Sequence, residues 1–123
     1  MPVRSLHSSV HKWPAQAQVD AAARAWATEM VRQHPEVVQL GYFGSYARGD
    51  WGVGSDLDLI ALITHSDVPF TQRPLGWNLL DLPVPAEIMI YTLTEWQQLQ
   101  AERRRLARVI ADEAVWIYAA AAS

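Results

Sequence analysis

The chain contains no cysteine among its 123 residues, which excludes disulfide bonds and metal sites built on thiolates. It also lacks a long apolar run, because the longest aliphatic stretch, 57–63, is interrupted by Asp58 and is far too short to span a bilayer. Residues 1–13 mix basic, histidine and polar side chains without the apolar core of a signal peptide. We therefore expect a soluble, cytoplasmic protein with no membrane partner.

A basic excess is missing as well. The net charge is −3, whereas proteins that bind nucleic acids directly usually gather positive charge on one face. Direct nucleic-acid binding is therefore not expected. Binding of a single nucleotide is compatible with the net charge, because a bound metal can supply positive charge. The four histidines show no spacing typical of metal ligands.

Hydrophobic periodicity divides the chain into an N-terminal arm, residues 1–13, and a single domain, residues 14–123, long enough for a core of its own. The pattern predicts a helix over 14–33, strands over 36–43, 55–64 and 86–91, a short helix over 45–48 and a last helix over 92–118. Thr92 and Glu95 form a capping box at the start of that last helix. Prolines break the stretch 65–85, where only 75–82 has room for a short helix. The predicted fold class is α+β, a small mixed sheet flanked by helices.

Asp56 and Asp58 are two positions apart on a predicted strand, so both side chains leave the same face, about 6.6 Å apart at the backbone. Two ionised carboxylates roughly 5 Å apart repel by about 3 kcal/mol at an effective dielectric near 20. A divalent cation would remove that repulsion. Since only oxygen ligands are present, Mg²⁺ is the natural candidate, and it usually completes its shell with waters and substrate phosphates.

Gly44 and Ser45 supply a complementary group, because a glycine lets the backbone approach closely and exposed amides at a helix start receive phosphate oxygens. A nucleotidyl transfer that uses two metals needs a third carboxylate on a neighbouring strand. Glu87 fits, since it interrupts an otherwise apolar strand that can pair beside the aspartates. The competing interpretation makes Glu87 a rim acid or the partner of Arg48 in a salt bridge.

The run Gly44-Ser45-x-Ala47-Arg48-Gly49, followed by Gly54-Ser55-Asp56-x-Asp58-Leu59, closely resembles the signature of the DNA polymerase β-like nucleotidyltransferase superfamily, in particular its minimal nucleotidyltransferases. The resemblance covers about residues 14–118. It implies the nucleotidyltransferase fold, a site for two Mg²⁺ ions and ATP or another nucleoside triphosphate as substrate.

Carried over residue by residue, the resemblance makes Gly44 and Ser45 the triphosphate site. Arg48 and Ser55 belong to the same motif and are further nucleotide-binding candidates, although an ion pair with Asp50 is the favoured interpretation of Arg48. The resemblance implies that three residues ligate the metals and carry the catalysis: Asp56, Asp58 and Glu87. The family usually has Asp at the position of Glu87, which makes nucleotide binding a firmer expectation than catalysis.

Minimal nucleotidyltransferases of this type typically pair with a small helical protein of the HEPN class, a ribonuclease toxin, and some act as antitoxins by transferring AMP to a tyrosine of that partner. The resemblance therefore implies an adenylyltransferase whose acceptor is a hydroxyl on a partner protein. A non-catalytic module that binds nucleotide or neutralises its partner by contact is the alternative. A small-molecule enzyme of the aminoglycoside type is less favoured, because no residues remain to build an acceptor pocket. A homo-oligomer stays open.

Four arginines lie on the predicted last helix among acidic residues, at positions 103, 104, 105 and 108. The favoured interpretation is a solvated helix face, and a docking surface is the alternative.

Overall fold

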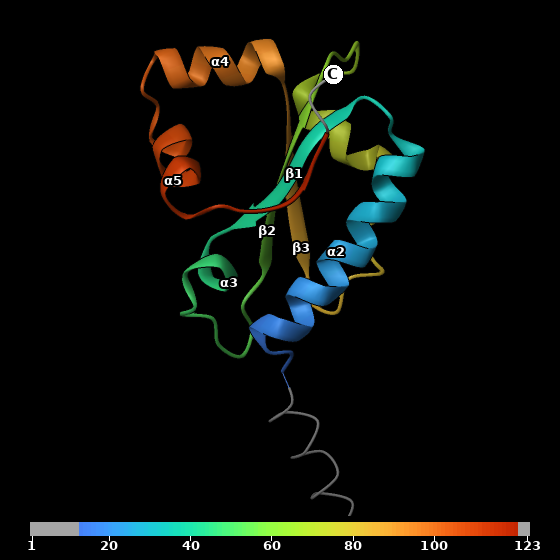
Figure 1. Ribbon diagram of the computed structural model, residues 1–123, viewed down its shortest axis with the longest axis vertical. Coiled ribbons are helices and arrows are strands. Elements are labelled where there is room, and N and C mark those ends of the chain that lie inside the picture. The colour runs from blue at the N-terminus through green and yellow to red at the C-terminus, as the bar shows by residue number, and fades with distance from the viewer. Residues whose placement is uncertain (1–12, 121–123) are drawn as a thin grey trace, which may run out of the picture.

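Four strands form one mixed sheet in the computed structural model, which describes residues 13–120 (Figure 1). The strands β1 (Val37–Phe43), β2 (Leu57–Ile63), β3 (Ala86–Thr92) and β4 (Val115–Ala119) lie in the order β3-β2-β1-β4. β1 is antiparallel to both of its neighbours, whereas β2 and β3 are parallel. The predicted α+β class with a small mixed sheet is confirmed. The predicted arm falls outside the described residues except for Trp13, whose Nε1 donates to the Tyr46 hydroxyl at 2.9 Å.

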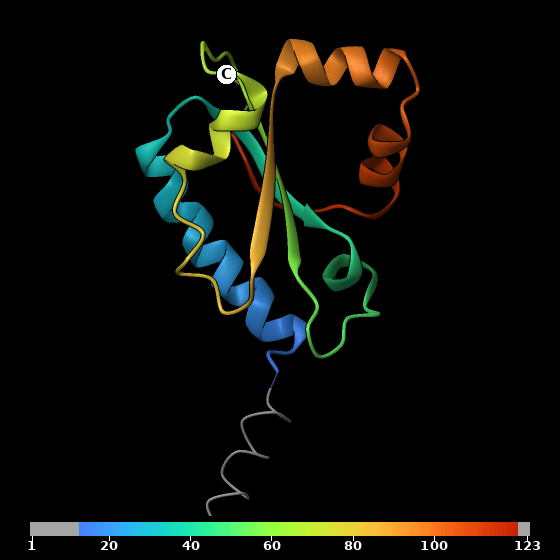
Figure 2. The same ribbon diagram turned by 180° about the vertical axis from the view of Figure 1, so that it is seen from behind.

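Different helices cover the two faces of the sheet, as Figures 1 and 2 show. α2 (Gln16–Gln33) packs on one face, and α4 (Leu93–Ala101) with α5 (Arg105–Glu113) packs on the other. The alternation along β2 assigns Leu57 and Leu59 to the core on the α2 side, and Ile60 and Leu62 to the core beneath α4 and α5. Asp58 has the parity of Ile60, so it belongs to the face that α4 and α5 cover.

The predicted last helix over 92–118 is wrong in two places: the chain turns at 102–104, which divides the helix, and it forms a strand from Val115 on. α4 ends at Ala101, Arg103 adopts a left-handed φ of 54°, and Arg104 N–H donates to the Leu99 carbonyl at 3.0 Å, the bond that closes a Schellman turn. α5 follows, and the chain from Val115 on pairs with β1 as a fourth strand. Its β-branched and aromatic residues suit a strand, and pairing with β1 outweighs the helical period.

The expectation that a short helix would occupy 75–82 is also wrong. The structure has a 3₁₀ helix, η1 (Phe70–Gly76), and the chain from Trp77 to the start of β3 is irregular. The short helix α3 (Ser45–Arg48) is present where the sequence predicts it, directly after β1. Among the helices of residues 13–120, none is both long and apolar enough to cross a membrane.

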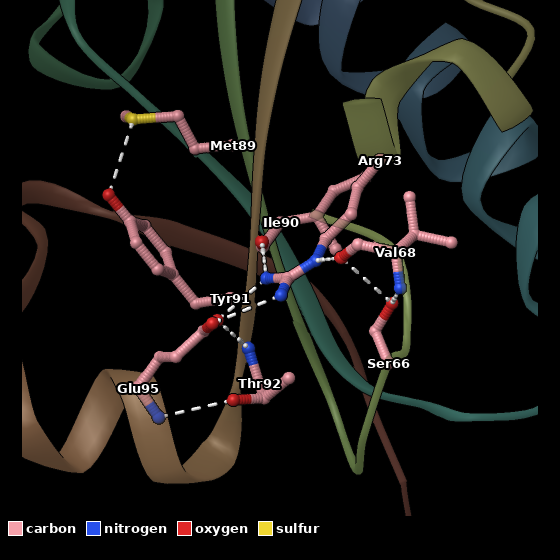
Figure 3. A network of polar contacts seen from close by, with 8 residues as sticks. All are labelled: Ser66, Val68, Arg73, Met89, Ile90, Tyr91, Thr92 and Glu95. Atoms are coloured by element: carbon pink, nitrogen blue, oxygen red, sulfur yellow. Dashed lines mark hydrogen bonds and ion pairs between the residues drawn. The ribbon is translucent and has the colours of Figure 1, made fainter. Parts of the chain in front are cut away.

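Arg73 joins η1 to the edge strand β3 and to the start of α4, as Figure 3 shows. Its guanidinium donates to the carbonyl oxygens of Val68 at 2.8 Å and Ile90 at 2.9 Å, and to both carboxylate oxygens of Glu95 at 2.6 and 3.0 Å. Glu95 in turn accepts from the Thr92 N–H at 2.8 Å, while its own N–H donates to the Thr92 hydroxyl at 3.2 Å. The predicted capping box is confirmed, and Arg73 extends it into the sheet.

We expect Arg73→Met to lower the free energy of unfolding by about 2 kcal/mol, because the change removes the ion pair with Glu95 and the hydrogen bonds to the carbonyls of Val68 and Ile90. Arg32→Met is the matched control, since the Arg32–Glu29 pair is exposed and should contribute under about 1 kcal/mol. Urea denaturation of the two variants and the wild type measures both effects. Equal stability of the two variants would contradict the structural role of Arg73.

The ion pair between Arg73 and Glu95 also predicts that the fold loses stability in acid. The hydrogen bond from Arg73 lowers the pKa of Glu95 to about 2, below its ordinary value of 4.5, against the opposing effect of burial. The ionised carboxylate therefore stabilises the fold fully above about pH 4.5, and that stabilisation is lost as the pH falls toward 2. The stability of Arg73→Met should fall less steeply across this range than that of the wild type.

Candidate functional site

A cavity of about 570 Å³ lies where β1 runs into α3 and where β2 begins, beside α5. Five of its lining residues are site residues predicted from the sequence, namely Gly44, Ser45, Arg48, Asp56 and Asp58. The other residues that line it are Phe43, Arg105, Val109 and Glu113. The predicted phosphate turn and the predicted metal-binding aspartates therefore share one cavity.

Strand register brings the acidic residues together. Asp58 on β2 stands opposite Phe43 on β1 and opposite Glu87 on β3, so these three side chains are lateral neighbours on one face of the sheet. Asp56 lies on the same side, just ahead of the first residue of β2. Glu87 is exposed and does not line the cavity, although it is the direct cross-strand neighbour of Asp58. Its role as a metal ligand stays a prediction.

The turn after β1 touches the carboxylate of Asp58. Gly44 has φ 82° and ψ −153°, a backbone conformation that is almost restricted to glycine. A Cβ at this position would also overlap the Asp58 carboxylate. The two parts of the motif are therefore in contact, which explains why glycine occupies position 44.

The negative charge at Asp58 is only partly balanced by the protein. Burial raises the pKa of Asp58, the charges of Glu87 and Asp56 raise it further, and Arg48 opposes the shift. The carboxylate repulsion expected from the sequence is thus present in the fold, and a cation in the cavity would relieve it.

The donor set suits a hard divalent metal, because Asp56 and Asp58 offer carboxylate oxygens in a cavity with room for waters and phosphate oxygens. Within residues 13–120, no group of three His, Asp or Glu side chains is arranged to hold a metal ion. Asp56 and Asp58 would leave most positions of a Mg²⁺ shell to water and other oxygen ligands.

Arg48 binds two acids on opposite sides of the turn. Its Nε lies 3.0 Å from Asp50 Oδ2, so the predicted pair with Asp50 is confirmed. Its Nη1 lies 3.3 Å from Glu113 Oε1, and the same oxygen accepts a hydrogen bond from the Gly44 N–H at 3.0 Å. A salt bridge from Arg48 to Glu87 is not what the structure shows.

Ser55 lies next to the cavity without lining it. Its hydroxyl accepts a hydrogen bond from the Gly52 N–H at 2.8 Å, and its own N–H donates to the Gly52 carbonyl at 3.0 Å. These bonds close the turn between Arg48 and Asp56. The structure therefore shows Ser55 shaping the loop, and its contact with nucleotide stays a prediction.

Sequence reasoning missed the contribution of α5 to the site. Arg105, Val109 and Glu113 line the cavity and recur every four residues, so they form one stripe along the helix. That spacing is visible in the sequence, but the apolar residues at 106 and 110 mark the neighbouring stripe, about 100° around the helix, as the one that packs on the core. Arg105 belongs to the arginine group interpreted as a solvated face, and it is exposed at the rim of the cavity.

Comparison with known proteins identifies the family. Residues 24–117 match the model of the nucleotidyltransferase domain, which is most of the 123-residue chain. The chain belongs to this family, and the resemblance carried by the Gly-Ser and Asp-x-Asp motifs is confirmed.

Two solved structures share the fold. One is a protein from Sulfolobus solfataricus to which nucleotidyltransferase activity has been ascribed, with a TM-score of 0.60, 16% identity, and coverage of 85% of this chain and 83% of that one. The other belongs to a toxin-antitoxin complex with AMP-PNP, with a TM-score of 0.50, 15% identity, and coverage of 79% and 73%. At such identities the likeness establishes the fold. No curated protein matches the chain.

Proposed function

We propose that this protein is a Mg²⁺-dependent nucleotidyltransferase that moves a nucleoside monophosphate, AMP from ATP, onto a hydroxyl of a partner protein. The observation that carries the proposal is the single cavity in which the Gly44-Ser45 turn meets Asp56 and Asp58. Membership of the nucleotidyltransferase domain family supports the reaction class. The size of the cavity, about 570 Å³, is in the range of small-molecule sites.

Each part of the cavity has a role in this reaction. The backbone of Gly44 and Ser45 and the Ser45 hydroxyl bind the triphosphate, and Asp56 and Asp58 hold the metal, with Glu87 as the third carboxylate. A bound Mg²⁺ would neutralise charge on the phosphates and lower the pKa of an acceptor hydroxyl. The contact between Gly44 and Asp58 places the phosphate turn directly beside the carboxylate, so a triphosphate on the turn would lie next to a metal held by Asp58.

The proposed acceptor is a HEPN-type toxin, for which this protein would be the antitoxin. Support comes from the structural neighbour in a toxin-antitoxin complex with AMP-PNP, which has the same fold. The cavity opens at the protein surface beside α5, where Arg105 is exposed, so an acceptor side chain on another protein has a route to it.

The test is transfer of label from ATP labelled in its α-phosphate, with Mg²⁺, to a HEPN-type protein supplied as the acceptor. We expect label on that protein with the wild type and none with the double variant Asp56→Ala, Asp58→Ala. Asp67→Ala is the matched control, since Asp67 is an exposed acid in a loop outside the cavity. Bound ATP without any transfer by the wild type would contradict the catalytic proposal.

A second candidate is a non-catalytic module that binds nucleotide and neutralises its partner by contact. The exposure of Glu87 outside the cavity favours it, because only two carboxylates then face a metal. The same double variant separates the two proposals: neutralisation that survives Asp56→Ala, Asp58→Ala does not depend on transfer.

A further inference from the structure

Glu113, the last residue of α5, reaches into the site and binds the phosphate turn. Its Oε1 accepts the Gly44 N–H at 3.0 Å and lies 3.3 Å from Arg48 Nη1. The side chain is mostly buried, with 20% of its surface exposed. A carboxylate oxygen of the protein itself therefore occupies donors that suit an anionic ligand.

This position is electrostatically unfavourable for an acid. The C-terminal end of a helix carries partial negative charge, and α5 has no basic residue in its last turn to offset it. Glu113 also adds to the negative charge around Asp58 that Glu87 and Asp56 already create. Contacts with Gly44 and Arg48 offset this cost.

We propose that Glu113 occupies a phosphate subsite while the site is free of nucleotide, and that a triphosphate displaces it and takes over the Gly44 N–H and the Arg48 guanidinium. This inference rests on the proposed function, since it assumes a nucleotide in this cavity. Carboxylate and phosphate oxygens accept from the same donors, and two anions at one donor pair repel. Nucleotide and Glu113 are therefore competitors.

Displacement also gives Arg48 a second role. In the structure its Nη1 is directed to Glu113 and its Nε to Asp50. Once Glu113 leaves, the Nη1 donor becomes available to a phosphate oxygen while the bond to Asp50 still orients the guanidinium. Glu113 thus sets how strongly the site holds a triphosphate.

The test compares Glu113→Gln with Asp112→Asn by calorimetric titration with AMP-PNP and Mg²⁺, and separately with inorganic triphosphate and Mg²⁺. Both variants remove one negative charge from the end of α5, but Asp112 is exposed and does not line the cavity. We expect Glu113→Gln to bind both ligands about tenfold more tightly than the wild type, and Asp112→Asn to change Kd less than about twofold.

The outcomes separate this inference from the proposed function. Wild-type protein that binds AMP-PNP, with Glu113→Gln binding it equally or more weakly, overturns the inference alone. No binding of AMP-PNP by either protein at millimolar concentration overturns both proposals.

A second measurement on the unaltered protein avoids the risk that Glu113→Gln folds poorly. In the ¹³C,¹⁵N-labelled wild type, inorganic triphosphate with Mg²⁺ should shift the Glu113 carboxyl resonance and the Gly44 amide resonance over one and the same titration curve. A Gly44 shift without any change at the Glu113 carboxyl contradicts displacement.

Discussion

Asp58→Asn should reduce nucleotidyl transfer by about 10³-fold, because it removes the charge of a proposed metal ligand that lines the cavity. The same substitution should leave the fold intact or make it slightly more stable, by under about 1 kcal/mol. The two amino acids have nearly the same shape, and the change ends the repulsion that Glu87 and Asp56 exert on Asp58.

The direction of the stability change follows from the pKa. Burial and the neighbouring acids raise the pKa of Asp58 in the folded protein above its ordinary value. The ionised side chain therefore destabilises the fold at neutral pH, and this cost is relieved as the pH falls through the raised pKa. Thermal unfolding at pH 7 should thus give a Tm for Asp58→Asn equal to or above that of the wild type.

Magnesium offers an independent measurement on the same variant. A metal that binds only the folded protein raises Tm with its concentration, so Mg²⁺ should stabilise the wild type and have little effect on Asp58→Asn. Asp67→Asn, in an exposed loop, is the control and should keep both transfer and the response to Mg²⁺. Transfer within tenfold of wild type in Asp58→Asn would show that this carboxylate is dispensable.

Gly44→Ala should lose transfer by more than about 10²-fold and lower the free energy of unfolding by about 2 to 4 kcal/mol. The added Cβ would be strained at φ 82° and would overlap the Asp58 carboxylate, so either the turn or the aspartate must move. Denaturant unfolding and the labelled-ATP assay measure the two losses.

Gly49→Ala is the matched control for Gly44→Ala. Gly49 also has a positive φ, 88°, but a Cβ there would meet nothing within 4 Å. It should cost about 1 kcal/mol through backbone strain alone and keep most of the transfer activity. If the two variants behaved alike, the contact between Gly44 and Asp58 would not matter to the site.

The order of the elements along the chain follows from local pattern with few exceptions. The alternation over 57–63 assigns Asp58 to the side opposite Leu57 and Leu59, and the two separate cores of the structure confirm this. A strand repeats every two residues whatever it pairs with, so the sequence is sufficient here. The capping box at Thr92 and Glu95 is likewise local and likewise present.

The errors fall where distant segments meet. Residues 115–118 continue a helical period, but β1 has a free edge and their β-branched and aromatic side chains pair with it. Arg73 gives no sign in the sequence that it will bind Glu95, which lies 22 positions later. Both the pairing of 115–118 with β1 and the Arg73–Glu95 ion pair depend on which segments the folded sheet brings together.

Some parts of the site also follow from local sequence, and others depend on contacts between distant segments. The glycine-serine turn and the paired aspartates lie within fifteen positions of one another, so turn geometry and strand alternation are enough to predict their chemistry from the residues. The bond from the Gly44 N–H to Glu113 joins residues 69 positions apart, and the Asp58–Glu87 pair depends on the register of β2 with β3. Local spacing carries no information on either, because such neighbours are chosen by the packing of whole elements around the two cores. For this reason the reaction class could be inferred from the printed residues, whereas the acid that competes for the phosphate turn emerged only from the folded chain.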